Sequence, residues 1–174
     1  MRELLLGAGF DRTKRMGTIG TTWNRMTALD INPRCMPHVV YDLNSGDLPF
    51  LPFKDASFDE IHAYEVMEHV GRQGDWRFFF RQFDDFARVL KPSGVFYMSS
   101  PHAQSRWLWG DPGHTRYVGP ELFAFLNREE YRRQLGKTMM TDYRSYFSSD
   151  WRIIHYERIG ESNYIGLQSV GKTQ

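Results

Sequence analysis

The stretch Leu4-Leu5-Leu6-Gly7-Ala8-Gly9 begins with three consecutive apolar residues and ends in a glycine-rich turn. A short apolar run of this kind is typical of a buried parallel strand, and glycine lets the chain turn sharply after it. Residues 26–29 and 38–41 are further short segments of this kind, and each runs directly into an aspartate, Asp30 and Asp42. The beginning of the sequence therefore predicts three short strands joined by loops.

The rest of the chain continues the alternation of strands with helices. Residues 58–64 alternate apolar and polar side chains as a strand does, and the apolar residues of 76–90 recur at helical spacing. Further on we expect a strand over 94–99, one or two helices over 120–136, and a hairpin of two strands over 151–158 and 163–170. This order predicts an α/β fold with a mostly parallel sheet, to which the hairpin adds one antiparallel strand.

Length and composition narrow the class of protein. The chain has 174 residues, 22 Lys and Arg against 21 Asp and Glu, and a formal net charge of +1. This balance excludes a nucleic-acid binder that works by bulk charge. A single cysteine, Cys35, cannot form an internal disulfide, and no apolar run approaches the roughly 20 residues of a membrane span. We expect a cytoplasmic protein of one domain with no membrane association.

The ends of the predicted strands indicate where a ligand binds. In an open parallel sheet ligands bind at the carboxyl ends of the strands. A carboxylate after the second strand can accept both hydroxyls of a ribose, and an acid at the next strand end can accept from an exocyclic amine. The pattern therefore predicts a pocket for a nucleoside-containing cofactor. The residues at the five strand ends are Gly7, Ala8 and Gly9, then Asp30, Asp42, Glu65 and His102.

The order and spacing of these pieces resemble the class I S-adenosylmethionine-dependent methyltransferases, in particular the methyltransferase type 11 and ubiquinone-pathway groups. The resemblance extends over about residues 4–101, and Arg88-Val89-Leu90-Lys91-Pro92-Ser93-Gly94 is its most characteristic part. The other matching stretches are Leu4-Leu5-Leu6-Gly7-Ala8-Gly9, Ala28-Leu29-Asp30-Ile31, Tyr41-Asp42-Leu43 with Leu48-Pro49-Phe50, and Phe58-Asp59-Glu60-Ile61 with Glu65-Val66-Met67-Glu68-His69-Val70.

The resemblance implies a fold and a division of the chain. The expected fold is a single Rossmann-like domain over residues 1–174, with a mostly parallel seven-stranded sheet, an antiparallel strand from the C-terminal hairpin, and helices on both faces. Within it we expect a core over 3–101, an acceptor-side loop and helices over 102–150, and the hairpin over 151–170.

The resemblance also implies a cofactor, S-adenosylmethionine, and the residues that bind it. These residues are Gly7 and Gly9, with Ala8 between them, at the methionine part, Asp30 on the ribose hydroxyls, Ile31 on the adenine, Asp42 and Leu43 at the adenine amino group, and Glu65 and Val66 under the sulfonium.

Two positions depart from the family pattern. Leu5 stands where the family usually has an acid, and Asp11 where it has a third glycine. We expect Asp11 or a backbone carbonyl to orient the amino group of the methionine instead. The helix that usually connects the first two strands is expected to be truncated or absent.

A group of acids and histidines suggests two alternative mechanisms. Glu65, Glu68 and His69 have the spacing i, i+3, i+4, which places them on one face of a helix, and His114 could complete a site for a divalent metal such as Mg²⁺. A similar Glu-x-x-Glu-His pattern serves metal-assisted methylation in small-RNA 3′-terminal 2′-O-methyltransferases and ubiquinone-pathway O-methyltransferases. In the alternative without a metal, His69, His102 or His114 acts as a general base.

The sequence leaves the methyl acceptor open. The loop over 99–117 is expected to form the wall of the acceptor pocket. Trp107, Trp109 and Tyr117 could stack on a planar acceptor or pack against the core, and Arg106 and Arg116 could hold an anionic group.

The leading functional hypothesis is a methyltransferase that acts on an oxygen or nitrogen nucleophile of a small molecule, a sugar or a nucleic acid. The alternative is a module that binds S-adenosylmethionine or S-adenosylhomocysteine without efficient turnover and acts with a partner. Because the acceptor side is expected to be thinly covered, a homodimer could close it.

Overall fold

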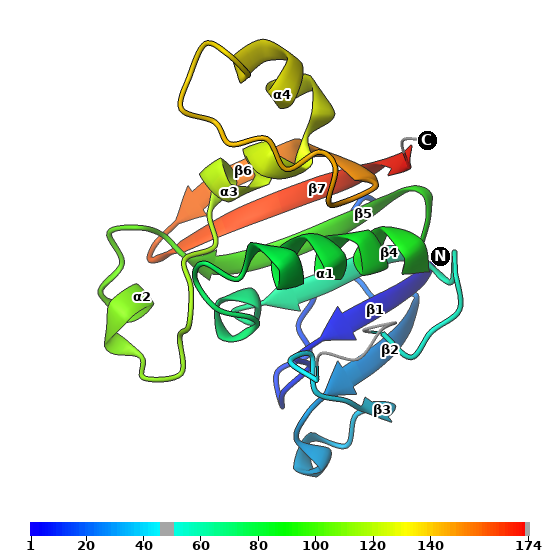
Figure 1. The fold of residues 1–174 in the computed structure, drawn as a ribbon. Helices are drawn as coiled ribbons and strands as arrows, with labels where there is room; N and C mark the ends of the chain where they lie inside the picture. Colours follow the sequence, from blue (N-terminus) through cyan, green and yellow to red (C-terminus); the bar gives the residue numbers. More distant parts are fainter. Residues whose placement is uncertain (46–50, 173–174) are drawn as a thin grey trace.

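A computed structural model describes residues 1–45 and 51–172, with only the backbone at residue 172. The described residues contain one seven-stranded sheet in the order β3-β2-β1-β4-β5-β7-β6 (Figure 1). Strands β1 to β5 pair in parallel, whereas β7 is antiparallel to both of its neighbours. The predicted mostly parallel sheet with one antiparallel strand is confirmed. The strands are β1 Arg2–Leu6, β2 Arg25–Asp30, β3 Val39–Val40, β4 Phe58–Tyr64, β5 Leu90–Pro101, β6 Ser149–Ile159 and β7 Ser162–Lys172.

The longest helix, α1, spans Trp76–Val89, within one residue of the predicted range. The Asp75 side chain caps it by accepting from the Phe78 amide at 3.1 Å. The chain passes from α1 directly into β5, so the segment 91–94 lies within this strand and not in a separate turn. The remaining helical segments are η1 Pro33–Cys35, η2 Met67–His69, α2 Arg106–Gly110, α3 Pro120–Phe123, η3 Ala124–Leu126 and α4 Arg128–Gln134. None of the helices formed by the described residues is long and apolar enough to cross a lipid bilayer.

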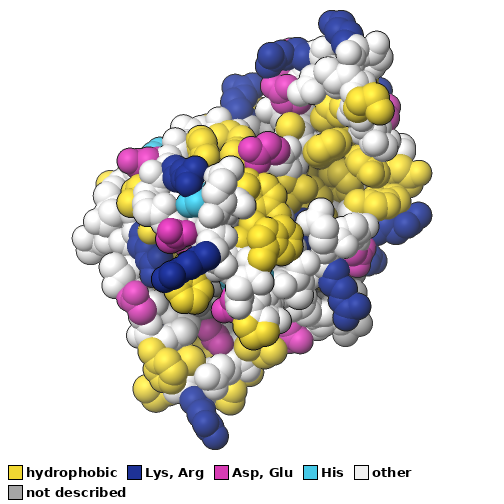
Figure 2. Space-filling model, turned by 90° about the vertical axis from the view of Figure 1, so that its left-hand side faces the viewer, with side chains coloured by type: hydrophobic (Ala, Val, Ile, Leu, Met, Phe, Trp, Pro, Cys, Tyr) yellow, Lys and Arg dark blue, Asp and Glu magenta, His cyan; other side chains and the backbone are white. Residues whose placement is uncertain are grey.

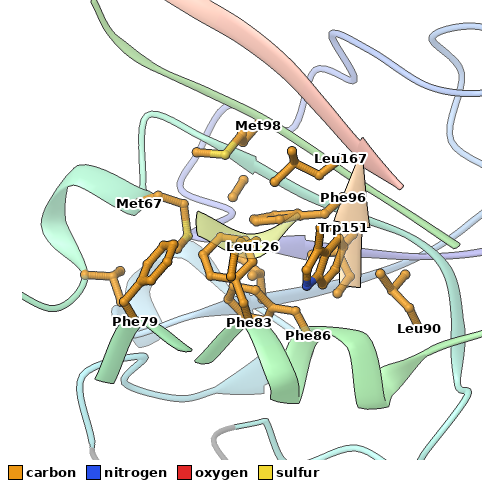
Figure 3. Close-up of a cluster of buried hydrophobic side chains, with 14 of the residues drawn as sticks. Met67, Phe79, Phe83, Phe86, Leu90, Phe96, Met98, Leu126, Trp151 and Leu167 are labelled. Atoms are coloured by element: carbon orange, nitrogen blue, oxygen red, sulfur yellow. The ribbon is translucent and has the colours of Figure 1, made fainter. Parts of the chain in front are cut away.

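The main hydrophobic core lies between α1 and one face of the sheet (Figure 3). The rings of Phe96 of β5 and Trp151 of β6 both contact the Phe83 ring of α1, and Leu4 of β1 belongs to the same cluster. The α3–α4 segment packs against this cluster as well, through Phe123, Leu126 and Tyr131. The predicted period of α1 therefore reflects a real apolar face, which buries its aromatic residues against the sheet.

The expectation of helices on both faces is wrong for the opposite face of the sheet. That face is covered by the connection between β1 and β2, residues 7–24, which contains no helix. The anticipated loss of the helix between the first two strands is thereby confirmed. Apolar contacts on this face are few and involve small clusters around Leu5 and Tyr97.

A buried polar network, instead, attaches this loop to the sheet. The ammonium of Lys14 lies 2.5 Å from a carboxylate oxygen of Glu3 and 3.1 Å from one of Glu60, and all three side chains are at most 1% exposed. His62 continues the network by contacting Glu60 at 3.1 Å and the Tyr64 hydroxyl at 2.9 Å. These strand side chains therefore place charged groups on this face, whereas the face toward α1 is mainly apolar.

The ionisation of the network follows from its contacts. Burial alone would raise the pKa of Glu60, but hydrogen bonds from His62, Thr18 and Lys14 outweigh it and hold this pKa below its usual range. Burial would likewise lower the pKa of Lys14, but its contacts with Glu3 and Glu60 raise it. Lys14 and Glu60 thus form a charged pair in the interior.

Candidate functional site

A cavity of about 270 Å³ opens at the carboxyl ends of β1 to β4, where the strand-end rule predicts a ligand. Its walls come from four separate strand ends and from the segment that follows β4. The cavity residues are Gly7, Leu29, Asp30, Ile31, Tyr41, Asp42, Leu43, Asn44, Glu65, Val66, His69 and Val70.

The glycine turn after β1 approaches the segment after β4 very closely. Gly7 has φ +56°, and a Cβ atom at this position would lie 2.4 Å from Cγ2 of Val66. Only glycine meets both constraints without displacing its neighbour. Gly9 also has a positive φ, but neither it nor the buried Ala8 lines the cavity. The turn therefore brings backbone, rather than side chains, to the floor of the cavity.

Asp30 is the acid that the structure holds most firmly at the cavity wall. It is 8% exposed, and its two carboxylate oxygens accept from the backbone amides of Gly9 at 2.8 Å and Asn32 at 2.7 Å. A carboxylate can accept about four hydrogen bonds, so further donors from a ligand can be accommodated. Next to it, Ile31 is 62% exposed and presents an apolar surface to the cavity.

The end of β3 supplies the opposite wall. Asp42 is exposed, with one oxygen accepting from the Asn44 amide at 2.8 Å, and Leu43 is buried behind it. Sequence reasoning missed Asn44, which accepts from the Gly71 amide at 2.7 Å and donates to the His69 carbonyl at 3.2 Å. An asparagine two residues after a strand-end acid is the signal that could have identified it, because asparagine side chains in turns commonly hydrogen-bond to backbone groups.

Asp11 does not take the place predicted for it. Its carboxylate accepts from the Thr13 amide at 2.9 Å and lies 3.5 Å from Arg15, so it stabilises its own turn and does not line the cavity. Leu5, at the position where the family has an acid, is buried on the opposite face of the sheet.

The prediction that Glu65, Glu68 and His69 share one face of a helix is also wrong. Glu65 has a left-handed backbone conformation, φ +54°, and only the short 3-10 turn η2 follows it. Its carboxylate accepts from the Ser99 hydroxyl at 2.7 Å, which fixes it beneath the cavity. A left-handed residue between strand and turn breaks the helical register, so the i, i+3, i+4 geometry cannot form.

A second cavity, of about 250 Å³, adjoins the first and shares Glu65 and His69 with it. In its wall, potential ligand atoms of Glu68, His69 and His114 lie within 4.8 Å of one another. The structure thus brings together three of the four residues predicted to bind a metal, and leaves Glu65 outside the group.

The donor set of this group fits a divalent cation. Nδ1 of His69 lies 3.1 Å from the Gly113 carbonyl, and Nδ1 of His114 lies 3.2 Å from the Leu108 carbonyl. A carbonyl can only accept, so both Nδ1 atoms donate and both Nε2 atoms carry a free lone pair. This is the arrangement in which a histidine binds a metal through one nitrogen while its other nitrogen is held in place.

Glu68 completes the group as a carboxyl with unmet hydrogen-bonding capacity. It is 0% exposed, and neither of its oxygens has a hydrogen-bond partner among the described residues. Burial, reinforced by the nearby carboxylates of Glu65 and Asp111, raises the pKa of Glu68 to about 8. A cation beside it would compensate both the burial and the missing partners.

His102, the third predicted catalytic histidine, lies elsewhere. It is 5% exposed, its Nδ1 accepts from the Gln104 amide at 3.0 Å, and its Nε2 lies 2.8 Å from the Arg158 guanidinium. It lines neither of the two cavities. The structure therefore connects His102 to the C-terminal hairpin and not to a reaction centre.

Comparison with known proteins identifies the family of this fold. Residues 5–98 match the family described as "Methyltransferase domain". The chain belongs to this family. The resemblance to class I S-adenosylmethionine-dependent methyltransferases is thereby confirmed.

Individual relatives of this methyltransferase domain agree with the assignment. A probable S-adenosylmethionine-dependent methyltransferase of Mycolicibacterium smegmatis is 33% identical over 112 residues, which cover 64% of the chain but only 38% of the relative. A solved S-adenosylmethionine-dependent methyltransferase of Archaeoglobus fulgidus superposes with a TM-score of 0.56 at 17% identity, covering 96% of this chain and 85% of that one. The 1,6-didemethyltoxoflavin-N1-methyltransferase of Burkholderia thailandensis, solved with bound S-adenosylhomocysteine, gives a TM-score of 0.52 at 12% identity, covering 98% and 71%. At these identities the structural likenesses confirm the fold.

Proposed function

We propose that this methyltransferase domain binds S-adenosylmethionine in the cavity at the strand ends and transfers its methyl group to an oxygen or nitrogen nucleophile. Family membership supports the cofactor. The proposal rests mainly on the position of Asp30. Its carboxylate lies nearly buried at the cavity wall, where hydrogen bonds from the Gly9 and Asn32 amides fix its orientation. A pre-oriented anionic acceptor of this kind suits the two hydroxyls of a ribose.

The other residues of the cavity follow from this placement of the ribose. The adenine ring would pack on Ile31, with Asp42 accepting from its amino group and Leu43 behind it. The methionine part would run along the Gly7–Gly9 turn. The sulfonium would then lie over Glu65 and Val66, where the first cavity joins the second. The acceptor would enter through the second cavity, past the exposed Trp107.

The bound cofactor supplies a methyl group on a positively charged sulfur, which is already activated for displacement. It would donate this methyl group to the acceptor atom as the carbon–sulfur bond broke, and the electron pair would remain on the sulfur. The acceptor loses one proton. If no metal is bound, His69 or His114 can receive it, because the lone pair of each Nε2 is then free in the cavity wall. Alignment of the reacting atoms by the two cavities supplies much of the remaining acceleration.

Calorimetry with S-adenosylhomocysteine tests the cofactor site. Asp30→Ala removes a charge-assisted acceptor and should weaken binding by at least about tenfold, since such a hydrogen bond contributes roughly 1.5–3 kcal/mol. Asp55→Ala, the same change at a side chain that is 75% exposed and does not line the cavity, is the matched control. Equal affinities of the two variants would refute the proposed site.

The alternative function, a binding module without turnover, predicts the same calorimetric result. It is favoured by Leu5, which leaves the usual acid of the family without a counterpart in the cavity. Methyl transfer from labelled cofactor to a panel of hydroxyl and amine acceptors separates the two. Tight binding of S-adenosylhomocysteine with no labelled product from any acceptor would favour the module.

We further propose that Glu68, His69 and His114 bind a divalent cation. Two imidazoles and one carboxylate suit Mn²⁺, Co²⁺ or Zn²⁺ better than Mg²⁺. Such a cation, when bound, would lower the pKa of an acceptor hydroxyl. Titration with Mn²⁺, followed by its paramagnetic resonance, should show one site that Glu68→Gln weakens by more than about tenfold. Mn²⁺ binding that is equal in Glu68→Gln and in the control His102→Gln would refute it.

The edge strand β6 is the surface we propose for the predicted homodimer. It has no partner on its outer side among the described residues, and Ile153, Ile154, Tyr156 and Ile159 are each at least 37% exposed along it. Exposed apolar edge strands tend to pair with another chain. Light scattering should give a dimer mass that Ile154→Lys reduces to the monomer. A monomer mass for the parent protein over a wide range of concentrations would contradict this.

A further inference from the structure

A third cavity, of about 210 Å³, lies at the N-terminal end of α1. It shares no lining residue with the two cavities already described. Figure 2 shows hydrophobic side chains gathered on the right-hand side of the face drawn there, bordered by Lys and Arg side chains. Five aromatic residues line this cavity: Trp76, Phe79, Phe80, Phe125 and Tyr143.

One wall of this cavity is a buried arginine without a counter-ion. Arg116 is 5% exposed, and its Nε has no hydrogen-bond partner among the described residues. Its Nη1 reaches only the Val70 carbonyl, at 3.5 Å, the long limit of a hydrogen bond. The guanidinium carbon lies 5.0 Å from the ring centroid of Phe79, an attractive contact that does not replace an anion.

The nearest acid does not neutralise this arginine. None of the ion pairs formed by the described residues includes Arg116, and the acid that acts on it, Asp75, uses its side chain to cap α1. Burial lowers the pKa of Arg116 to about 10, an effect that the charge of Asp75 only partly offsets. A buried, unpaired guanidinium is costly, and a bound anion would recover much of that cost.

The shape and lining of the cavity restrict what can bind. Guanidinium groups present planar, forked donors that match carboxylate and phosphate oxygens. The aromatic walls favour a flat apolar body beside this anionic group. With 210 Å³ the cavity is smaller than the roughly 300–1,000 Å³ of pockets for drug-sized ligands, so it suits one substituted ring or a fused pair.

We propose that this cavity is a second ligand site, which binds a small aromatic carboxylate or phosphate with its anionic group on Arg116. The site is connected to the proposed reaction centre through the chain itself. Thr115, between His114 and Arg116, donates its amide to the Glu68 carbonyl at 2.9 Å and its hydroxyl to the Gly71 carbonyl at 2.6 Å. A ligand on Arg116 would therefore stabilise the segment that carries His114.

Calorimetry with 2-naphthoate and phenyl phosphate, and with 2-naphthylmethanol as the neutral comparison, tests the proposal. We expect the anionic probes to bind at least about tenfold more tightly than the neutral one, and to quench the fluorescence of Trp76. Arg116→Met should abolish this preference, whereas Arg106→Met, a change at an exposed arginine on α2, should leave it intact. Binding of S-adenosylhomocysteine, measured on the same samples, reports on the cofactor site separately.

Leu122→Trp provides a test that leaves the arginine in place. Leu122 is half-buried in the cavity wall, and the larger side chain should fill the cavity and block the anionic probes even if Arg116→Met fails to fold. The proposal is overturned if neither anionic probe binds the parent protein, if the neutral probe binds equally well, or if Leu122→Trp leaves binding unchanged.

Discussion

Replacing Lys14 by methionine should cause a large loss of stability, because its ammonium is the one cation that contacts both Glu3 and Glu60 among the described residues. Methionine has a similar length and fills the same space without the charge. Removing one partner of a buried ion pair typically costs about 3–5 kcal/mol, since the remaining charges stay buried and uncompensated. At roughly 2–4 °C per kcal/mol for a chain of this size, the midpoint of thermal unfolding should fall by roughly 6–20 °C.

The same variant should recover at low pH, and the sign of this effect follows from the depressed pKa of Glu60. A carboxyl with a lowered folded-state pKa contributes stability above its unfolded pKa of about 4.3, and this contribution is lost as the pH falls. Urea unfolding of parent and Lys14→Met should therefore differ most near pH 7, and the difference should shrink as the pH falls below about 4.3 toward the low folded-state pKa of Glu60. Arg15→Met, at the neighbouring but exposed position, should cost at most about 1 kcal/mol. A difference at pH 7 below 1 kcal/mol for Lys14→Met would refute the role given to the network.

Three further outcomes are expected. Gly7→Ala should abolish detectable S-adenosylhomocysteine binding in calorimetry, because its Cβ would lie 2.4 Å from Val66; near-parental affinity would contradict the close approach. Burial, with the charges of Glu65 and Asp111, raises the pKa of Glu68 to about 8. The folded state therefore keeps this carboxyl protonated, and the free energy of unfolding falls as the pH rises from about 4.3, the unfolded pKa, through 8. In chelator, urea unfolding should consequently show Glu68→Gln to be more stable than the parent at pH 9 but not at pH 5. His102→Gln should reduce the free energy of unfolding by about 1 kcal/mol, seen as a lower thermal midpoint, and should leave the affinity for S-adenosylhomocysteine unchanged. Weakened binding would place His102 in the site after all.

The parts of the fold that sequence predicts well are those with a local periodic signal. The helical spacing of aromatic residues in α1 and the alternation of side chains in β4 predicted the bounds of both elements to within one residue. Both patterns are local, since they repeat every three to four residues in a helix and every two in a strand. Strand-end acids were predictable for the same reason: Asp30 and Asp42 directly follow apolar runs. The predicted stretch Leu48-Pro49-Phe50 lies outside the described residues.

Features that depend on distant contacts could not be predicted in this way. Glu65 looked like a helix residue, but its amide donates to the Ser99 carbonyl and its side chain accepts from the Ser99 hydroxyl, which fixes a left-handed turn. Arg116 looked like a residue of the acceptor wall, and its burial against Phe79 depends on the packing of α1. In neither case does the local spacing carry the decisive information.

The charged face of the sheet can be explained by the hydrogen bonds of the loop that covers it. A helix satisfies its own backbone amides, whereas a loop packed on a sheet needs acceptors from elsewhere. Here Glu60 accepts from the Thr18 amide at 2.8 Å, Glu3 from the Asn24 amide at 2.6 Å, and the Tyr64 hydroxyl from the Met16 amide at 3.1 Å. The acids that the loop requires are in turn neutralised by the lysine that the loop inserts. The loop that lies where a helix is expected and the buried charges of the sheet therefore depend on each other, and the same loop begins at the glycine turn beside the cavity at the strand ends.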